Sequence, residues 1–288
     1  MINRVDTLFH ITKFDALKIL LQEGFKPSFA IEKLKDKNII VPMVSFSNIL
    51  LRDLGENEVL NYGEYGIGFS RNWAIKNNIN PVIYSYQEGE TLTSITKFLE
   101  NSVLVSRLKH FKKSFNEWSN NKIGKFSSHI KVENTSKEAI ALADYLSQNY
   151  DEELIELLSD FADSIYQSTK PIMFLAKPYL VQNRKGEDVI AYNDREWRKT
   201  YLDLNFFIEE EEEFKYWLDQ EKPHLHDEQY RLNFEVSDIS AILVRNSDDI
   251  GNIIQILEEI SSPEVVANLI NTNKLIIGTK DQLINNGL

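Results

Sequence analysis

The sequence contains no cysteine, and this absence excludes several kinds of site at once. Without a thiol the chain cannot form a disulfide, use a thiolate nucleophile or bind zinc or an iron–sulfur cluster through sulfur. The N-terminus, MINRVDTLFH, lacks the apolar stretch of a signal peptide, and no run approaches the roughly 18 apolar residues of a membrane-spanning helix. We therefore expect a soluble cytoplasmic protein.

The common motifs for phosphate binding and hydrolysis are absent as well. The chain contains no GxxxxGK[ST], GxGxxG, GxSxG or HExxH pattern. Its five histidines form no cluster, and the pair His224 and His226 lies in a polar turn, which is more typical of an exposed surface than of a metal site. No metal is therefore expected. Neither an internal repeat nor a Pro/Gly/Ser-rich linker divides the chain, which predicts one domain over residues 1–288.

The composition is that of an ordinary globular protein, but its charge is unevenly distributed. Of 288 residues 42% are hydrophobic, enough for a sizeable core, and the net charge of -12 argues against a surface devoted to nucleic acid or anionic membrane. Residues 1–144 hold 19 Lys and Arg against 16 Asp and Glu, whereas residues 145–288 hold 13 against 28. The basic excess lies in residues 107–131, which form either a solvated helix face or a local site for a polyanion.

Hydrophobic periodicity predicts an α+β fold with a mostly antiparallel sheet and a helical insertion at about residues 91–167. Strands are expected at residues 7–12, 39–46, 65–70, 81–86, 171–176, 180–182, 188–192, 196–201, 231–235, 241–245 and 275–277. Helices outside the insertion are expected at residues 15–22, 49–60, 73–76, 209–220 and 250–260.

Three short segments have unusual composition. LFHIT places His10 and Thr12 at the end of an apolar strand, and YGEYGIGFS interleaves glycines with aromatic residues, which permits close backbone approach. In NDREWR, Glu196 lies among arginines, and neighbouring cations favour an ionised carboxylate. Each segment also has a purely structural explanation, as a strand-end histidine, a bulged aromatic strand and a salt-bridged strand.

The three segments together contain the residue types that NAD-dependent ADP-ribosyl transfer requires. A histidine can hydrogen-bond the ribose hydroxyls beside nicotinamide, and a tyrosine ring can stack on the nicotinamide. A glutamate can hold the ribose 2′-hydroxyl and stabilise the positive charge that develops as nicotinamide leaves. This chemistry needs neither a cysteine nor a metal, in agreement with the composition.

The sequence resembles the AbiGi family of abortive-infection proteins, which are described as antitoxins of phage-resistance systems. The resemblance is carried by LFHITKFDALKILLQEGFKPSF, PMVSFSNILL, YGEYGIGFSRNWAIKNNINPVIY, DREWR and RLNFEVSDISAILV, in the order of the family. It implies a bacterial protein that defends against phage, with a toxin or antitoxin partner encoded nearby.

The same segments are similar, more distantly, to the ADP-ribosyltransferase superfamily, and this similarity implies its fold as the core. It also implies that NAD is the cofactor, that His10 contacts ribose and that Glu196 is the catalytic glutamate. Tyr65 would stack on nicotinamide, with Tyr62 as the competitor for that role. The remaining cofactor-binding residues implied are Thr12, Gly66 and Arg71. Asp194 stands two positions before Glu196, where an arginine-specific transferase has a glutamate or glutamine, which disfavours arginine as the acceptor.

Three functions therefore remain open at this stage. The first is an enzyme that cleaves NAD or transfers ADP-ribose. The second is a non-catalytic antitoxin or sensor, whose acidic C-terminal half would complement a basic face of a protein partner. The third is a nucleic-acid-directed factor using residues 107–131, where Phe115, Trp118 and Phe126 can stack on bases.

Overall fold

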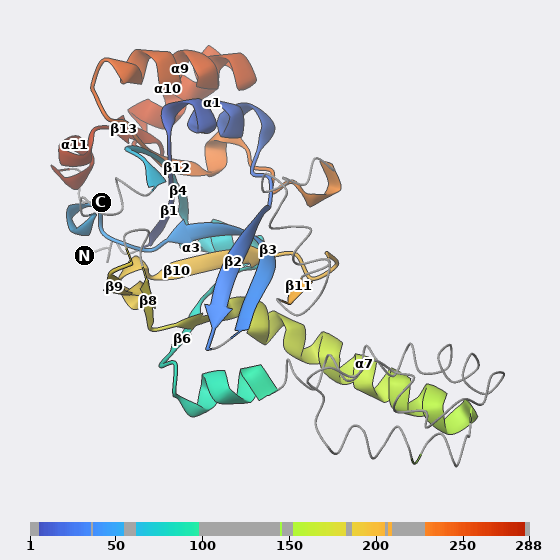
Figure 1. The fold of residues 1–288 in the computed structure, drawn as a ribbon. Helices are drawn as coiled ribbons and strands as arrows, with labels where there is room; N and C mark the ends of the chain where they lie inside the picture. The colour runs from blue at the N-terminus through green and yellow to red at the C-terminus, as the bar shows by residue number, and fades with distance from the viewer. Residues whose placement is uncertain are drawn as a thin grey trace. The chain divides into compact units, whose positions relative to one another are not determined.

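The computed structural model describes residues 6–35, 37–54, 62–97, 145, 152–182, 186–204, 207–208 and 228–285 (Figure 1). The chain divides into two compact units, one formed by Met1–Gln87 with Phe174–Leu288 and the other by Glu88–Met173. All the candidate site residues lie in the first unit. Within the described ranges, no helix has the length and apolar character needed to cross a membrane.

A nine-stranded sheet forms the centre of the first unit. Its strands are β1 (Thr7–Thr12), β2 (Ser28–Leu34), β3 (Lys37–Ser47), β4 (Tyr65–Ser70), β5 (Ile79–Pro81), β10 (Glu196–Thr200), β11 (Phe207–Ile208), β12 (Ile239–Leu243) and β13 (Ile276–Gly278). The order is β13-β12-β4-β1-β3-β10-β5, and β2 and β11 also pair with β3. Each pair is antiparallel except β12 with β13. The predicted mixed fold with a mostly antiparallel sheet is confirmed.

Two smaller sheets and several helices complete the described structure. The strand β6 (Ile83–Ser85) pairs in parallel with β7 (Ala176–Pro178), and β8 (Leu180–Gln182) pairs with β9 (Asp188–Ile190) as a hairpin. The helices are α1 (Phe14–Glu23), α3 (Arg71–Lys76), α7 (Glu152–Leu175), α9 (Asp249–Ile260), α10 (Pro263–Asn271) and α11 (Lys280–Asn285). The short 3-10 turns are η1 (Leu51–Asp53), η2 (Ala191–Asp194), η3 (Glu228–Tyr230) and η4 (Val236–Asp238).

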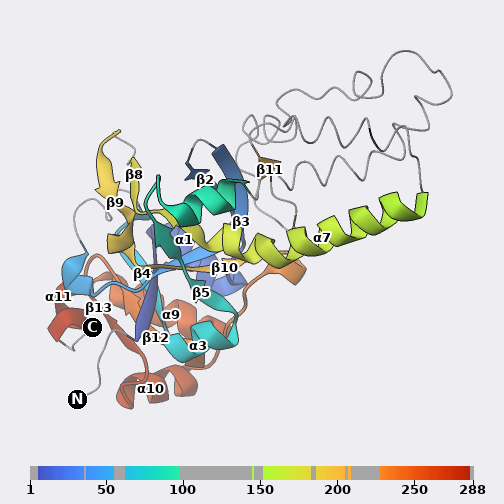
Figure 2. The ribbon, with the colours of Figure 1, turned by 90° about the horizontal axis from the view of Figure 1, so that it is seen from below.

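Both faces of the central sheet are buried, and they pack against different elements. Successive side chains of a strand point to opposite faces, so Leu8 lies on one face and Phe9 on the other. Leu8 belongs to a large core with residues of α1, α3, α9 and α10, and Figure 1 shows α1, α9 and α10 packed together. Phe9 belongs to a smaller core with residues of η1 and α11. Figure 2 shows α3, α9 and α10 on one side of β4 and β10, and the β8–β9 hairpin on the other.

The described part of the second unit is mainly helical. After a turn at residues 88–89, residues 90–97 form a helix, and α7 supplies residues 152–173, with Leu92, Ile95 and Met173 buried. Its range, 88–173, is close to that of the expected insertion at 91–167. The basic segment 107–131 and the predicted helix at 209–220 lie outside the described residues.

Several predicted elements differ from those observed. The strand predicted at 171–176 is wrong, because α7 continues to Leu175 with Pro171 inside it. Residues 81–86 are split into β5 and β6, and the strand predicted at 231–235 is a single bridge between Leu232 and Phe25. Only Leu51–Asp53 of the helix predicted at 49–60 is helical among the residues described there. The strand β2 and the helices α10 and α11 were not predicted.

The turn before β4 depends on Gly63, and this predicts a position-specific response to alanine. Gly63 has φ 127° and a Cβ there would overlap the backbone carbonyl of Thr12. Gly63→Ala should therefore lower the free energy of unfolding by more than about 2 kcal/mol, measured by urea denaturation. Gly251→Ala is the matched control, because Gly251 lies in α9 with no atom within 4 Å of a Cβ. It should raise the stability by about 0.5–1 kcal/mol, and equal effects of the two changes would contradict the described turn.

Candidate functional site

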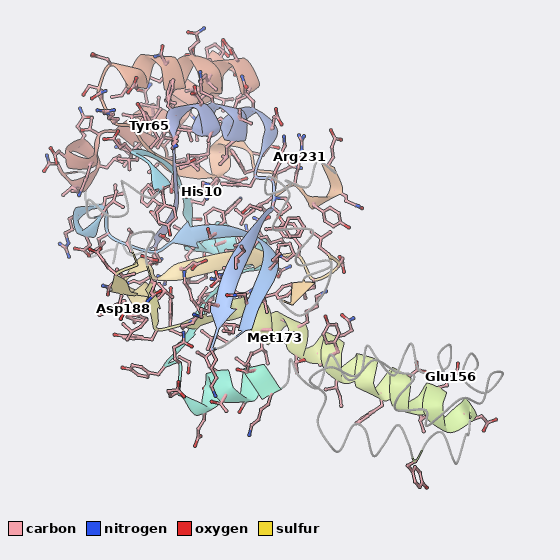
Figure 3. All side chains as sticks on the ribbon, in the orientation of Figure 1. His10, Tyr65, Glu156, Met173, Asp188 and Arg231 are labelled. Carbon is pink, nitrogen blue, oxygen red and sulfur yellow. The ribbon has the colours of Figure 1, made fainter. Side chains whose placement is uncertain are left out.

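The register of the sheet separates His10 from Glu196. Phe9 pairs with Ser47, and Ser47 pairs with Glu196, so these three side chains point to the same face. His10 follows Phe9 and therefore points to the opposite face. Its ring contacts agree, because the His10 ring lies 5.1 Å from Phe25 and 5.9 Å from Phe46 in the larger core. The structure therefore places His10 and Glu196 on opposite faces of the sheet. His10 is labelled in Figure 3.

The His10 ring packs against the larger core, and its surroundings favour the neutral form. Its Nδ1 lies 2.8 Å from the carbonyl oxygen of Ser45, which is a hydrogen bond if Nδ1 carries the proton. Burial lowers the pKa of His10, and the bond to Ser45 opposes this only in part. A neutral histidine packed between phenylalanine rings has the environment of a structural residue.

Tyr65 and Thr12 lie on the same face as His10. Thr12 pairs with Tyr65 in the sheet, and the Tyr65 hydroxyl donates a 2.9 Å hydrogen bond to Asp249 at the start of α9. Burial and this bond raise the pKa of Tyr65 to about 12. The Tyr65 ring lies 5.1 Å from that of Phe14 in α1. Tyr65 thus connects β4 to helices, and its hydroxyl is directed away from Glu196.

Gly66 and Arg71 also have structural contacts. A Cβ at Gly66 would lie 2.9 Å from the Cδ1 of Ile11, so the isoleucine side chain fills the space that the glycine leaves. Arg71 lies 3.2 Å from the carboxylate of Asp6 and donates its backbone N–H to the carbonyl of the same residue at 2.7 Å. Neither Gly66 nor Arg71 forms a site together with Glu196.

Glu196 forms the centre of a buried ion cluster that we call the Glu196 cluster, made of Glu32, Lys177, Glu196 and Arg198. Lys177 Nζ lies 2.6 Å from one carboxylate oxygen of Glu196, and Arg198 Nε lies 2.7 Å from the other. A second nitrogen of Arg198 bonds Glu32 at 2.7 Å and the third bonds the carbonyl of Phe174 at 3.0 Å. Arg198 has no exposed surface. Every charge in the cluster is therefore met by an opposite charge.

The cluster fixes the protonation of its members. Burial by itself raises the pKa of Glu196, but the Arg198 and Lys177 cations outweigh it and hold the value at about 2. Burial likewise lowers the pKa of Lys177, and the carboxylates of Glu196 and Glu32 more than reverse this. The predicted ionisation of Glu196 is confirmed, although its arginine partner is Arg198, while Arg195 is exposed in a left-handed conformation at φ 42°.

A group of tyrosines lies beside the Glu196 cluster, and we call it the tyrosine surface: Tyr62, Tyr84, Tyr86, Tyr179 and Tyr192. The Tyr84 hydroxyl accepts the backbone N–H of Glu196 at 2.8 Å. Burial raises the pKa of Tyr62, and the carboxylates of Asp194 and Glu196 raise it further, so the Tyr62 hydroxyl lies within the field of the cluster. Tyr62 and Tyr65 were the two candidates for stacking on nicotinamide. Of these two, Tyr62 is the one near Glu196.

The residues proposed for NAD do not fit one ligand. His10, Thr12 and Tyr65 lie on one face of the sheet, and Glu196 lies on the other with Tyr62 nearby. Both oxygens of the Glu196 carboxylate are bonded to cations rather than directed to a substrate. Across the described part of the chain, no group of three or more His, Cys, Asp or Glu side chains is arranged to hold a metal ion.

Comparison with known proteins supplies the family. The family model "Putative abortive phage resistance protein AbiGi, antitoxin" matches residues 32–245. The chain belongs to the AbiGi family. No curated protein and no solved structure matches it. The AbiGi assignment made from the sequence is confirmed and with it a role in resistance to phage, whereas the similarity to ADP-ribosyltransferases finds no support in a fold match.

The sequence did not point to Glu32, Lys177 or Tyr84 as parts of the site. Lys177 stands alone in the apolar run FLAKPYL, and a single charge in such a run signals a buried ion pair. Glu32 and Tyr84 gave no comparable signal, because their partners lie 166 and 112 residues away in the chain.

The ion cluster predicts how the stability of this AbiGi protein depends on pH. The pKa of Glu196 is about 2 in the folded chain against an ordinary value of 4.5, so its contribution is complete above about pH 4.5 and lost as the pH falls towards 2. Glu196→Gln should lower the free energy of unfolding at neutral pH by roughly 3–5 kcal/mol, since it leaves buried cations unpaired. Chemical denaturation between pH 2 and 7 measures both effects.

Glu228→Gln, at an exposed position, is the control and should change the stability by less than about 0.5 kcal/mol. The loss of stability on acidification below pH 4.5 should be smaller in Glu196→Gln than in the wild type. Parallel pH profiles of the two proteins would contradict the assigned ionisation of Glu196.

Proposed function

We propose that this AbiGi protein acts as an antitoxin that binds a protein partner, and that it does not act on NAD. The observation that carries the proposal is the separation of His10 from Glu196 by the sheet register, together with the pairing of Glu196 to two cations. The family description, abortive phage resistance antitoxin, supports the same function. Inhibition by binding needs a stable surface and no catalytic group.

The chemistry of ADP-ribosyl transfer shows why the separation matters. A catalytic glutamate must accept a hydrogen bond from ribose and lie beside the carbon that becomes positive. Glu196 would first have to leave Arg198 and Lys177, and breaking a buried ion pair costs roughly 3–5 kcal/mol. His10 would in addition have to reach across the sheet. Both requirements oppose the use of these residues on one NAD molecule.

Cleavage of NAD at a site formed by Tyr62 and Glu196 alone is the second candidate. The field of Glu196 at the Tyr62 hydroxyl favours it, because it brings an aromatic ring and a carboxylate to one place. In this arrangement Tyr62 takes the stacking role, and neither His10 nor Tyr65 takes part.

An NAD turnover assay discriminates between the two candidates. Purified protein incubated with NAD should release no nicotinamide above background by mass spectrometry, whether or not lysate of phage-infected cells is added. Tyr62→Ala and Glu196→Gln should give the same background as the wild type. Release that depends on Glu196 would overturn the antitoxin proposal and favour the enzyme.

Co-expression tests the antitoxin function itself. The protein encoded beside the AbiGi gene should arrest growth when expressed alone, and co-expression of this chain should restore growth. Expression of this chain alone should leave growth unchanged. If this chain arrests growth and its neighbour restores it, the roles are reversed and the proposal fails.

A further inference from the structure

The short parallel sheet of β6 and β7 lies at the two places where the chain leaves and re-enters the first unit. Strand β6 ends two residues before the first segment of that unit ends at Gln87, and β7 begins two residues after its second segment starts at Phe174. Because the two strands run in parallel, residues 86–175 are the crossover connection between them. We call β6 and β7 together the strap.

The strap is too small to be stable without further support. Each of its strands has three residues, and two short paired strands are at best marginally stable in water. Its backbone pairing is extended by the bond from the N–H of Tyr179 to the carbonyl of Ser85 at 2.7 Å. Among the residues that the structure describes, the buried Val82 and Ala176 belong to neither the larger nor the smaller core of the central sheet. The strap therefore depends on polar contacts for its attachment to that sheet.

Glu196, the first residue of β10, supplies these contacts through its side chain and through both polar groups of its backbone. Its backbone N–H donates to the Tyr84 hydroxyl at 2.8 Å, and its backbone carbonyl accepts the N–H of Val82 at 2.9 Å. Its carboxylate bonds Lys177 of β7 at 2.6 Å. Glu196 itself is paired with Ser47 of β3 in the central sheet. One residue of the sheet thus holds both strands of the strap.

Arg198 adds a bond at the point where the chain re-enters the first unit. It donates to the Phe174 carbonyl at 3.0 Å and to the Glu196 carboxylate at 2.7 Å. The bonds to the strap therefore share Glu196 and its partner Arg198. Hydrogen bonds in one network strengthen one another, so they are formed or broken together.

We infer that the strap is a conformational device that opens as a separate unit, with Glu196 as the residue that holds it closed, while the nine-stranded sheet stays folded. Regions with few apolar contacts to the rest of a protein open at lower free energies than its core. When the strap opens, both chain connections to residues 88–173 are released from the central sheet. The inference goes beyond the antitoxin function and does not depend on it, because local opening is measured on the purified chain without a partner.

Native-state hydrogen exchange of the full chain, measured by NMR at several urea concentrations below the unfolding transition, tests the inference. The amides of Val82 and Tyr179 report on the strap, because both N–H groups are bonded there. They should exchange at least about 10-fold faster than the slowest amides of β4, and their exchange should depend less on urea, because opening of the strap exposes less surface than global unfolding. Equal rates with equal dependence on urea would overturn the separate opening.

Tyr84→Phe tests whether Glu196 holds the strap closed. The change keeps the ring and removes the hydroxyl that accepts the Glu196 N–H, so the Val82 and Tyr179 amides should exchange roughly 5- to 30-fold faster than in the wild type. Tyr86→Phe is the matched control, because the Tyr86 side chain is 64% exposed, and it should leave the same rates within about twofold. Unchanged exchange in Tyr84→Phe would overturn the role of Glu196.

A variant in the core of the sheet tests the independence of the two parts. Ile253→Val removes one methyl group from α9 in the larger core, so the slowest amides of β4 should exchange roughly 2- to 10-fold faster. The Val82 and Tyr179 amides should keep their wild-type rates, because opening of the strap leaves this core intact. An equal acceleration of the strap amides would show that the strap opens only with the sheet, and the inference would fail.

Discussion

The guanidinium group of Arg198 is the contact on which much of the first unit depends. It joins β10 to β2 through Glu32 and to the last turn of α7 through the carbonyl of Phe174, and it bonds Glu196 within its own strand. A cation with no exposed surface has to be compensated where it lies. The strands that supply its partners are therefore constrained in register as well as in position. Lys177 and Tyr84 extend this constraint to β7 and β6, because Lys177 bonds the Glu196 carboxylate and the Tyr84 hydroxyl accepts the Glu196 backbone N–H.

Glutamate, histidine and tyrosine can have catalytic or structural roles. In this member of the AbiGi family, their surroundings favour structural roles. A histidine, a tyrosine and a glutamate from three segments suggest an NAD site in the sequence, but the glutamate carboxylate is bonded to two cations and the histidine ring packs against phenylalanines on the other face of the sheet. An inhibitor that works by binding gains from such rigidity, because a preformed surface costs little entropy on association. The ionised glutamate has a structural role, because it bonds Lys177 of β7 and its backbone N–H donates to Tyr84 of β6.

The sequence was sufficient where the signal is local and insufficient where it depends on distant pairing. Strand β4 and helix α1 were predicted because alternation and helical spacing show directly in YGIGFS and FDALKILLQE. The predicted strand at 171–176 is wrong, because α7 continues through Pro171 to Leu175. For the site, Glu196 was predicted to be ionised from the arginines on both sides of it in the sequence, of which Arg198 is the partner in the structure. Whether His10 shares the face of Glu196 is decided by the pairing of both strands with β3, and no local pattern reports that register.

The strand order also has a consequence for synthesis of the chain. Strands β1, β3 and β4 come from the first 70 residues, but β3 lacks its neighbour β10 until residues 196–200 are made, and β4 lacks β12 until residues 239–243 are made. A nascent chain on the ribosome therefore presents open strand edges for a long time, and such edges invite aggregation and proteolysis. Contacts between distant residues also slow folding. The open edge of β4 is therefore covered only after residues 239–243 have been made, near the end of synthesis.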